Sequence, residues 1–394
     1  MTSTVDNRST DRVALAADTV PVLREHALWA EDNRRLHEEA IAALGNAGVF
    51  RLRVPAQYGG DEATAATLLR TLVEIGRGDG SAAWLSAVWS ICAWITGLYP
   101  DHVQQEVFAD PDTRVCGVLS PTAVAEPRDG GIVVNGKWAF ISGAHHSQWQ
   151  LVLAMAPTPD GSSQWPVMAL VPMSDLRIED DWHTAGLRGT GSVTTVAQNV
   201  FVPGDRVLPM VALLQGQYAS AANAGKPLFQ APLIATGCIS FAASAVGLAK
   251  AALESFLDRL PGRKITYTDY TSQREAPLTH LQLAEATLKA DEAEFHAGRL
   301  AAMLDDKGAA GEQWTVLDRV TARALLGRVL ALVKDCVELL YTASGGSAVY
   351  AGVPIQRIVR DVQVLSLHAL MHPDTNFELY GRVLAGLEPN TMYL

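Results

Sequence analysis

The sequence of 394 residues predicts an α+β protein in which a helical segment, a β-domain and a helical bundle follow one another. Apolar residues recur at helical spacing in the first and last parts of the chain. Short apolar runs broken by Gly, Pro, Asp and Asn fill the part between them. With 48% hydrophobic and 19% charged residues, the chain can bury a large core. We expect three domains, at residues 1–110, 111–218 and 219–394.

The first segment has the apolar spacing of amphipathic helices. The turn VPAQYGGDEAT, residues 54–64, interrupts this spacing with a proline and two adjacent glycines. Trp84, Trp89 and Trp94 then recur every five residues. Because an α-helix has about 3.6 residues per turn, this spacing distributes the tryptophans around a helix. We expect most of them to lie in the core.

The middle segment contains runs that are typical of β-strands, because β-branched and aromatic residues alternate there with turn formers. These runs are GIVVNGKWAF, WQLVLAMA, PVMALVPM and TTVAQNVFVP. After Pro232 long helical periods return, and the last of them ends at Gly345-Gly346, a natural helix stop. Long helices that are apolar on more than one face pack in bundles, so a homo-oligomer built on them is expected.

Charge and cysteine content exclude several functional classes. The net charge of −11, without a cluster of Lys and Arg, argues against nucleic acid or an anionic membrane as the main partner. The four cysteines are scattered and form no CxxC pair, which favours a reducing compartment. The N-terminus is not typical of a secretory signal, and we find no run of about 18 apolar residues. We expect a soluble, cytoplasmic protein.

Several common catalytic motifs are absent from the sequence. It has no GxGxxG opening a helix, no GxxxxGK[ST], no HExxH and no GxSxG. The adjacent His145 and His146 are a poor metal signal, because successive residues of a strand point to opposite faces. We expect no metal site. A polar turn with one exposed histidine and one hydrogen-bonded histidine is the simpler interpretation, and which of the two faces a pocket stays open.

Four longer segments carry a family resemblance. They are VPAQYGG, NGKWAFISGAHHSQW, GLRGTGSVTTVAQNVFVP and SGGSAVYAGVPIQRIVRDVQ, in this order. With them the chain resembles the acyl-CoA dehydrogenase superfamily from end to end. The resemblance implies an N-terminal helical domain, a central β-barrel-like domain and a C-terminal four-helix bundle. In this family the three domains hold a flavin, usually in a homotetramer.

Within this superfamily the sequence is similar to the flavin-dependent monooxygenases. The dehydrogenases carry a glutamate base at one of two places, and this chain has Gly237 near one and SLHALMHPDT at the other. The combination of WxFxSGxxHxxW, GLRGTGS and RDVQVLSLHA instead resembles oxygenase components such as p-hydroxyphenylacetate 3-hydroxylase, the steroid phenol hydroxylases and the actinomycete polyketide hydroxylases. The missing base therefore favours an oxygenase over a dehydrogenase.

The resemblance implies a two-component enzyme. A separate NAD(P)H-flavin reductase would supply reduced FMN, with FAD as the alternative cofactor, and O2 would react with it to a flavin hydroperoxide. The expected reaction is hydroxylation of an aromatic or polycyclic small molecule in secondary metabolism.

The resemblance also implies individual site residues. His368 and Ser142 would be catalytic, with the imidazole able to donate a hydrogen bond or move a proton at neutral pH. The residues implied to bind flavin are Trp138, Ser142, Gly143, Ala144, Thr190, Ser192 and Arg263. Those implied to line a substrate pocket are Cys92, Trp94, Ser120 and His146. Taken singly, a serine in a turn or a lone histidine is more often structural.

Alternatives remain at this stage. Phenol-hydroxylating relatives have a histidine where this chain has Cys92, so an amine, either an amino sugar or an indole-type compound, could be N-oxygenated instead. Oxidation of sulfur is a further possibility. An acyl-CoA dehydrogenase with FAD and an unrecognised base is another alternative, and a catalytically silent flavoprotein that serves as a scaffold is the last.

Overall fold

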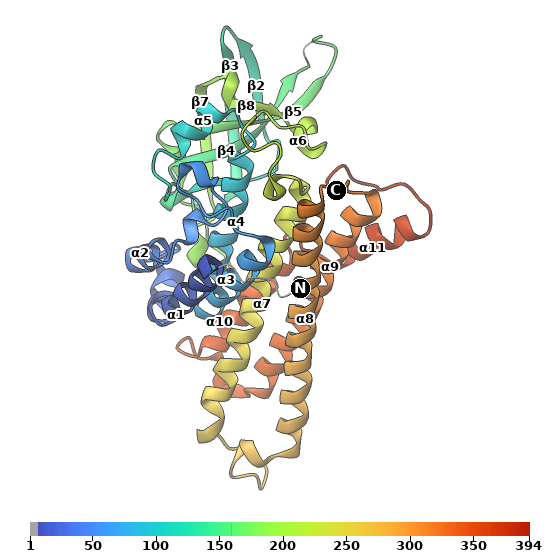
Figure 1. Ribbon diagram of the computed structural model, residues 1–394. Coiled ribbons are helices and arrows are strands. Elements are labelled where there is room, and N and C mark those ends of the chain that lie inside the picture. Colours follow the sequence, from blue (N-terminus) through green and yellow to red (C-terminus); the bar gives the residue numbers. More distant parts are fainter. Residues whose placement is uncertain (1–6, 159) are drawn as a thin grey trace.

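The structure is a computed structural model that describes residues 7–158 and 160–394 (Figure 1). Helices form both ends of the chain and strands form its middle. The helices before the strands are α1 (Asn7–Asn33), α2 (Glu38–Asn46), α3 (Ala65–Gly78), α4 (Gly80–Thr96) and α5 (Asp101–Val107). Those after the strands are α6 (Met210–Leu214), α7 (Leu233–Arg259), α8 (Pro277–Ala310), α9 (Val316–Ala343), α10 (Pro354–Ser366) and α11 (Pro373–Leu384). The predicted α+β class is confirmed.

The strands form one mixed sheet at the upper end of Figure 1. They are β1 (Val115–Gly117), β2 (Ala123–Arg128), β3 (Gly131–Ile141), β4 (Trp149–Pro157), β5 (Gln164–Pro172), β6 (Arg177–Glu179), β7 (Val193–Pro203) and β8 (Val207–Pro209). Their order is β6-β7-β3-β2-β4-β5-β8, with β1 parallel to β4. In the described part of the chain the two edge strands β6 and β8 do not pair, so the structure shows a central sheet.

All four strand runs expected from the sequence are strands, namely β3, β4, β5 and β7. The sequence did not predict β1, β6 and β8, which have three residues each and are too short to show an alternation. It also missed β2, which contains Pro127. The domain limits near residues 110 and 218 fit this order of elements and stay a prediction.

The helices after the sheet pack against one another, with α9 in contact with α7, α8, α10 and α11. Residues 233–262 are long and apolar enough to cross a membrane by composition alone, so the expectation of no such run was wrong. However, 94% of the apolar window lies inside the protein. Packing against neighbouring helices thus accounts for these apolar residues, as in the core helix of a soluble protein.

The helices from the two ends of the chain meet at a pair of glycines. A Cβ atom on Gly247 of α7 would lie 2.7 Å from the Cα atom of Gly76 in α3 and 2.6 Å from the carbonyl oxygen of Val73. Only glycine allows the two backbones to approach this closely. The contact joins the N-terminal helices to the bundle. It also holds α4, which follows α3 directly, against α7.

Candidate functional site

Helix α4 positions the site, because it contacts both the bundle and the β-domain. Every residue from Gly80 to Thr96 is buried, and Asp79 caps the helix by accepting a hydrogen bond from the Ala82 N–H at 2.8 Å. Trp94, expected near the substrate pocket, is fully buried and donates its indole N–H to the carbonyl oxygen of Leu228 at 2.9 Å. The other two tryptophans of this helix face the β-domain.

Two tryptophan–serine hydrogen bonds fix the turn after β3 against α4. The indole Nε1–H of Trp84 donates to Ser142 Oγ at 2.9 Å, and that of Trp89 donates to Ser147 Oγ at 3.0 Å. Gly143 lies between the two serines with φ of 75°, and a Cβ there would lie 2.8 Å from the Trp89 indole nitrogen. The turn therefore needs glycine for its backbone conformation as well as for the close approach of the indole.

The predicted residues Thr190 and Ser192 lie beside Ser142. Ser142 Oγ is 2.7 Å from Ser192 Oγ, which is 2.7 Å from Thr190 Oγ1. Thr190 Oγ1 donates to the carbonyl oxygen of Leu187 at 2.7 Å. Leu187 has φ of 50°, unusual for this residue, and its N–H donates to the buried carboxylate of Asp361 at 2.6 Å. The structure thus brings three predicted hydroxyls together in one buried chain.

His368 reaches the same place from the turn that follows α10. Its ring centroid lies 5.2 Å from that of Trp84 and 5.4 Å from that of Phe241, and these two aromatic rings stack at 4.7 Å. Burial lowers the pKa of His368 to about 4, so the imidazole is neutral at pH 7. Its Nδ1 accepts from the Leu370 N–H at 3.3 Å. The proton of the neutral ring is therefore at Nε2, which is a hydrogen-bond donor.

His146 is the buried member of the histidine pair and His145 is exposed. Burial, followed by the positive charge of Arg114, lowers the pKa of His146 to about 4. The Arg114 Nε–H donates to the carbonyl oxygen of His146 at 2.5 Å. The Nε2 atom of His146 has no hydrogen-bond partner among the described residues and is available to a ligand. Its place in a substrate pocket stays a prediction.

The remaining predicted site residues are spread over the molecule. Trp138 is fully buried in the β-domain core and donates to the Leu153 carbonyl oxygen at 2.9 Å. Ala144 is buried directly after Gly143, and Cys92 is buried on α4, where burial raises the pKa of its thiol well above the usual value. Ser120 is exposed between β1 and β2. Of these four residues, only Ala144 lies in the turn after β3 that packs against α4.

Arg263 follows α7 at the end of the bundle far from the sheet (Figure 1). Its Nη2 atom lies 3.1 Å from the point that a Cβ on Gly345 would occupy. Along α7, Arg259 is separated by about 27 Å of helix from Phe241, whose ring contacts Trp84 and His368, at about 1.5 Å per residue. Within one chain, Arg263 therefore does not reach the Ser142 turn.

Sequence reasoning missed two members of the cluster, Trp84 and Phe241. It interpreted Trp84 as core and gave Phe241 no role. One signal could have found Trp84: the spacing of five residues between Trp84 and Trp89 equals the spacing between Ser142 and Ser147. The signal is weak, because equal spacing on a helix and on a turn does not by itself imply contact.

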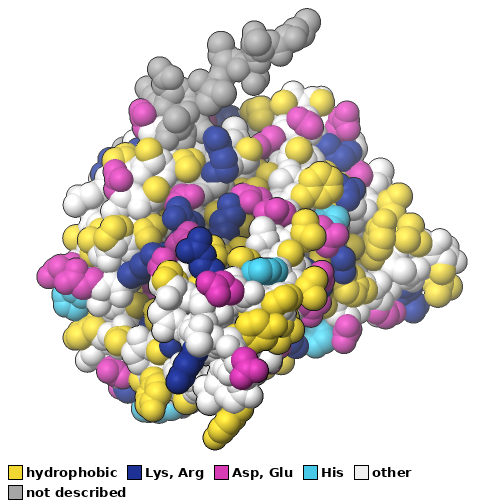
Figure 2. Space-filling view, turned by 90° about the horizontal axis from the view of Figure 1, so that it is seen from below, with side chains coloured by type: hydrophobic (Ala, Val, Ile, Leu, Met, Phe, Trp, Pro, Cys, Tyr) yellow, Lys and Arg dark blue, Asp and Glu magenta, His cyan; other side chains and the backbone are white. Residues whose placement is uncertain are grey.

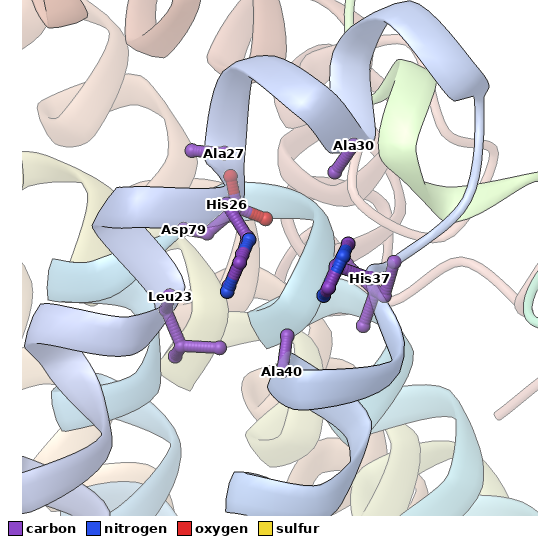
Figure 3. Close-up of a pocket in the computed structure, with 8 residues that line it drawn as sticks. Leu23, His26, Ala27, Ala30, His37, Ala40 and Asp79 are labelled. Carbon is purple, nitrogen blue, oxygen red and sulfur yellow. The ribbon is translucent and has the colours of Figure 1, made fainter.

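A second cluster of polar side chains lies between α1 and α2 (Figure 3). His26 and His37 stack with centroids 4.0 Å apart, and Glu39 completes a set whose possible metal-ligand atoms lie within 4.8 Å of one another. Imidazole lone pairs lie in the ring plane, so stacked rings do not aim them at one ion. His37 Nδ1 caps α2 by accepting the Glu39 N–H, and His26 Nε2 pairs with the Glu39 carboxylate at 3.1 Å. We interpret this cluster as a helix cap.

The cluster of Trp84, Ser142, Phe241 and His368 fits a flavin. Flavin is a flat aromatic ring system with hydrogen-bonding atoms along its edge, and the cluster combines stacked aromatic side chains with a serine hydroxyl and a neutral imidazole N–H. Gly143 and Ala144 beside Ser142 are small enough to allow a close approach. The residues present are thus of the kind that a flavin needs.

Comparisons with known proteins agree with this chemistry. Residues 12–110 match the family described as acyl-CoA dehydrogenase, N-terminal domain, and residues 239–373 match its C-terminal domain. The FADH(2)-dependent resorcinol hydroxylase, oxygenase component, of Rhizobium sp. (strain MTP-10005) is 32% identical over 98% of this chain and 96% of its own. The flavin-dependent monooxygenase, oxygenase subunit HsaA, of Rhodococcus jostii (strain RHA1) is 31% identical over 93% and 96%. XiaF from Streptomyces sp., in complex with FADH2 and glycerol, has 27% identity and a TM-score of 0.90, with 97% of each chain covered.

Proposed function

The chain belongs to the acyl-CoA dehydrogenase family and, within it, to the flavin-dependent monooxygenases; we propose that it is an oxygenase component that hydroxylates an aromatic or polycyclic small molecule. The observation that carries the proposal is the contact of both Ser142 and His368 with Trp84. These two residues were the catalytic pair implied by the resemblance. Their convergence on one indole supports a common site.

The cofactor is a reduced flavin, which supplies the electrons that O2 needs to react with a closed-shell molecule. The related resorcinol hydroxylase is FADH(2)-dependent and XiaF is in complex with FADH2, whereas the sequence resemblance implies FMN, with FAD as the alternative. Affinities of the apoprotein for FMNH2 and FADH2, measured anaerobically, decide which flavin it prefers.

The residues of this chain hold protons at defined atoms. His368, neutral at pH 7, presents its Nε2–H as a donor to an oxygen atom of a reactant. Ser142 contributes a hydroxyl oxygen that the Trp84 indole holds in place. Trp84 contacts both groups and Phe241 contacts His368, and the apolar surface of the two rings limits the access of water to this place. The three effects together favour oxygen transfer to substrate over release of peroxide.

The dehydrogenase alternative lacks its base. At Gly237, near one of the two places where the dehydrogenases carry their glutamate base, a Cβ atom would lie 3.6 Å from Leu370 and 3.7 Å from Phe241. A carboxylate at this position would thus point toward the aromatic cluster. Among the described residues, the hydrogen bonds and ring contacts of Trp84 and His368 include no carboxylate. The geometry therefore favours the monooxygenase.

The type of substrate depends on Cys92. A neutral buried thiol cannot stabilise a phenolate as a protonated imidazole can, and this favours a substrate that needs no such charge, such as a polycyclic aromatic or an indole-type amine. Mass spectrometry of products from a panel of phenols, polycyclic aromatics and amines distinguishes hydroxylation from N-oxygenation.

As an oxygenase component of a two-component system, the chain needs a flavin reductase as its partner. We propose that the reductase uses NAD(P)H and works with the enzyme in the cytoplasm. This location agrees with the four free cysteines, all of which are buried.

We also propose a homotetramer. Leu281, Leu288 and Phe295 recur every seven residues on α8 and are 72%, 64% and 63% exposed. This heptad spacing forms an apolar stripe that a second copy can cover. Figure 2 shows groups of hydrophobic side chains on the face seen from below. Arg263, distant from the Ser142 turn of its own chain, is then available to a flavin phosphate in a neighbouring copy.

The test of the function is a coupled assay with an NAD(P)H-flavin reductase, in which product and hydrogen peroxide are measured together. Wild type converts at least one member of the substrate panel, and His368→Ala consumes flavin at a similar rate while product falls by about 100-fold and peroxide rises. His102→Ala is the control, because His102 is an exposed residue paired with Asp205. Full product yield from His368→Ala would refute the assigned role.

A further inference from the structure

The hydroxyl chain that ends at Ser142 has a fixed direction. At its far end, Thr190 Oγ1 and the Leu187 carbonyl oxygen are 2.7 Å apart, and a carbonyl has no hydrogen, so the threonine hydroxyl must donate. Each hydroxyl has one hydrogen. Ser192 must therefore donate to Thr190, and Ser142 must donate to Ser192, across the two distances of 2.7 Å.

The hydrogen bond at Ser142, the other end of the row of hydroxyls, agrees with this direction. An indole Nε1–H can only donate, and Trp84 donates it to Ser142 Oγ at 2.9 Å. The single hydrogen of Ser142 points to Ser192, and one of its two lone pairs takes the Trp84 hydrogen. The other lone pair remains. Ser142 can accept one more hydrogen bond and has no hydrogen left to donate.

We propose that this row of hydrogen-bonded hydroxyls makes the site selective for the reduced state of the flavin. Trp84, Ser192 and Thr190 are then positioning residues that act through Ser142. The proposal rests on the proposed function, and on the family resemblance of the WxFxSGxxHxxW segment, which implies that Ser142 is the hydroxyl beside the flavin N5 atom. In reduced flavin N5 carries a hydrogen and donates; in oxidised flavin N5 is a bare acceptor. An acceptor-only Ser142 stabilises the first and meets the second with two opposed lone pairs.

Both ends of the row of hydroxyls are held in place, so the direction of its hydrogen bonds cannot reverse easily. Trp84 is fixed by its stacking on Phe241 and by the edge of His368. Leu187 is fixed by the hydrogen bond from its N–H to Asp361, and its carbonyl oxygen also accepts from the Trp182 indole at 3.0 Å. Thr190, Ser192 and Ser142 are all buried, so no bulk water is available to turn their hydroxyls.

The test is the midpoint potential of the bound flavin, because its difference from that of free flavin gives the ratio of the two dissociation constants, oxidised over reduced. In wild type this ratio is above one and the potential is raised. Ser192→Ala frees the Ser142 hydrogen to donate to oxidised N5, which lowers the ratio by about tenfold. For a two-electron couple a tenfold change lowers the potential by about 30 mV.

Two further variants keep the test decisive if Ser192→Ala folds poorly. Thr190→Val removes the acceptor of Ser192, whose hydroxyl can then turn toward Ser142, so the potential falls in the same way. Ser192→Thr keeps the hydroxyl and restores the wild-type potential. Ser86→Ala is the control, because it also removes a buried serine hydroxyl, which donates to the Ala82 carbonyl oxygen within α4, and it leaves the hydroxyls of Ser142, Ser192 and Thr190 in place.

A double-mutant cycle separates a directional effect from a structural one. In a Ser142→Ala background, Ser192 and Thr190 have no Ser142 hydroxyl to orient, so adding Ser192→Ala changes the potential no further. If Ser192→Ala binds flavin normally and its potential is unchanged, the proposed selectivity for reduced flavin is refuted, while the proposed function stands. Failure of wild type to bind reduced flavin at all overturns the proposed function itself.

Discussion

The neutral state of the partly buried His368 predicts how folding stability changes with pH. In the unfolded chain the imidazole takes a proton below its ordinary pKa of 6.5, whereas in the folded protein burial lowers the pKa to about 4. Between these values the unfolded state binds more protons, so stability is fully present above pH 6.5 and is lost as pH falls to 4. The residue we propose as a donor at neutral pH thus makes the fold acid-sensitive.

The fall in the pKa of His368 from 6.5 to about 4 corresponds to about 3.5 kcal/mol in full. At pH 4 the folded histidine is half protonated, so about 3 kcal/mol of this has been lost. His368→Asn removes the titrating group and keeps a polar side chain of similar size. Between pH 7 and pH 4, wild type should therefore lose about 3 kcal/mol more unfolding free energy than this variant.

Urea unfolding followed by tryptophan fluorescence, at one protein concentration and at half-unit steps of pH, measures the difference. His146→Asn is a useful comparison, because burial lowers the pKa of His146 to about 4 as well and the same difference is expected. If the His368→Asn profile ran parallel to that of wild type, the lowered pKa of His368 would be refuted.

Two other predictions concern the turns that hold Ser142. Gly143→Ala places a Cβ 2.8 Å from the Trp89 indole in a left-handed backbone conformation, so denaturant unfolding should show a loss of about 2–4 kcal/mol. Burial, with the nearby charge of Asp79, raises the pKa of Asp361 from 3.8 to about 7, so wild type loses stability as pH rises from about 4 to 7. Asp361→Asn still accepts the Leu187 N–H but no longer titrates, and its stability relative to wild type should rise by about 4 kcal/mol over that range, as measured by unfolding at pH 4 and pH 8.

Much of the fold could be predicted because it depends on local patterns. The helical periods in residues 238–260, 278–304 and 314–343 lie within or close to α7, α8 and α9, since an apolar stripe at the helical period must be buried wherever the helix packs. The same patterns could not say what covers a residue. The apolar composition of α7 meets the criteria for a membrane helix, and only its burial in the bundle distinguishes the two cases.

The candidate site divides in the same way. By itself the sequence determined the α+β class, the order of helices and strands, and a family resemblance that pointed to Ser142, Thr190, Ser192 and His368. Only the tertiary structure decided that the three hydroxyls form one directed chain and that Trp84 connects it to His368. The physical reason is that periodicity reports which residues are buried, whereas hydrogen-bond direction depends on which buried groups meet, and packing between distant segments determines that.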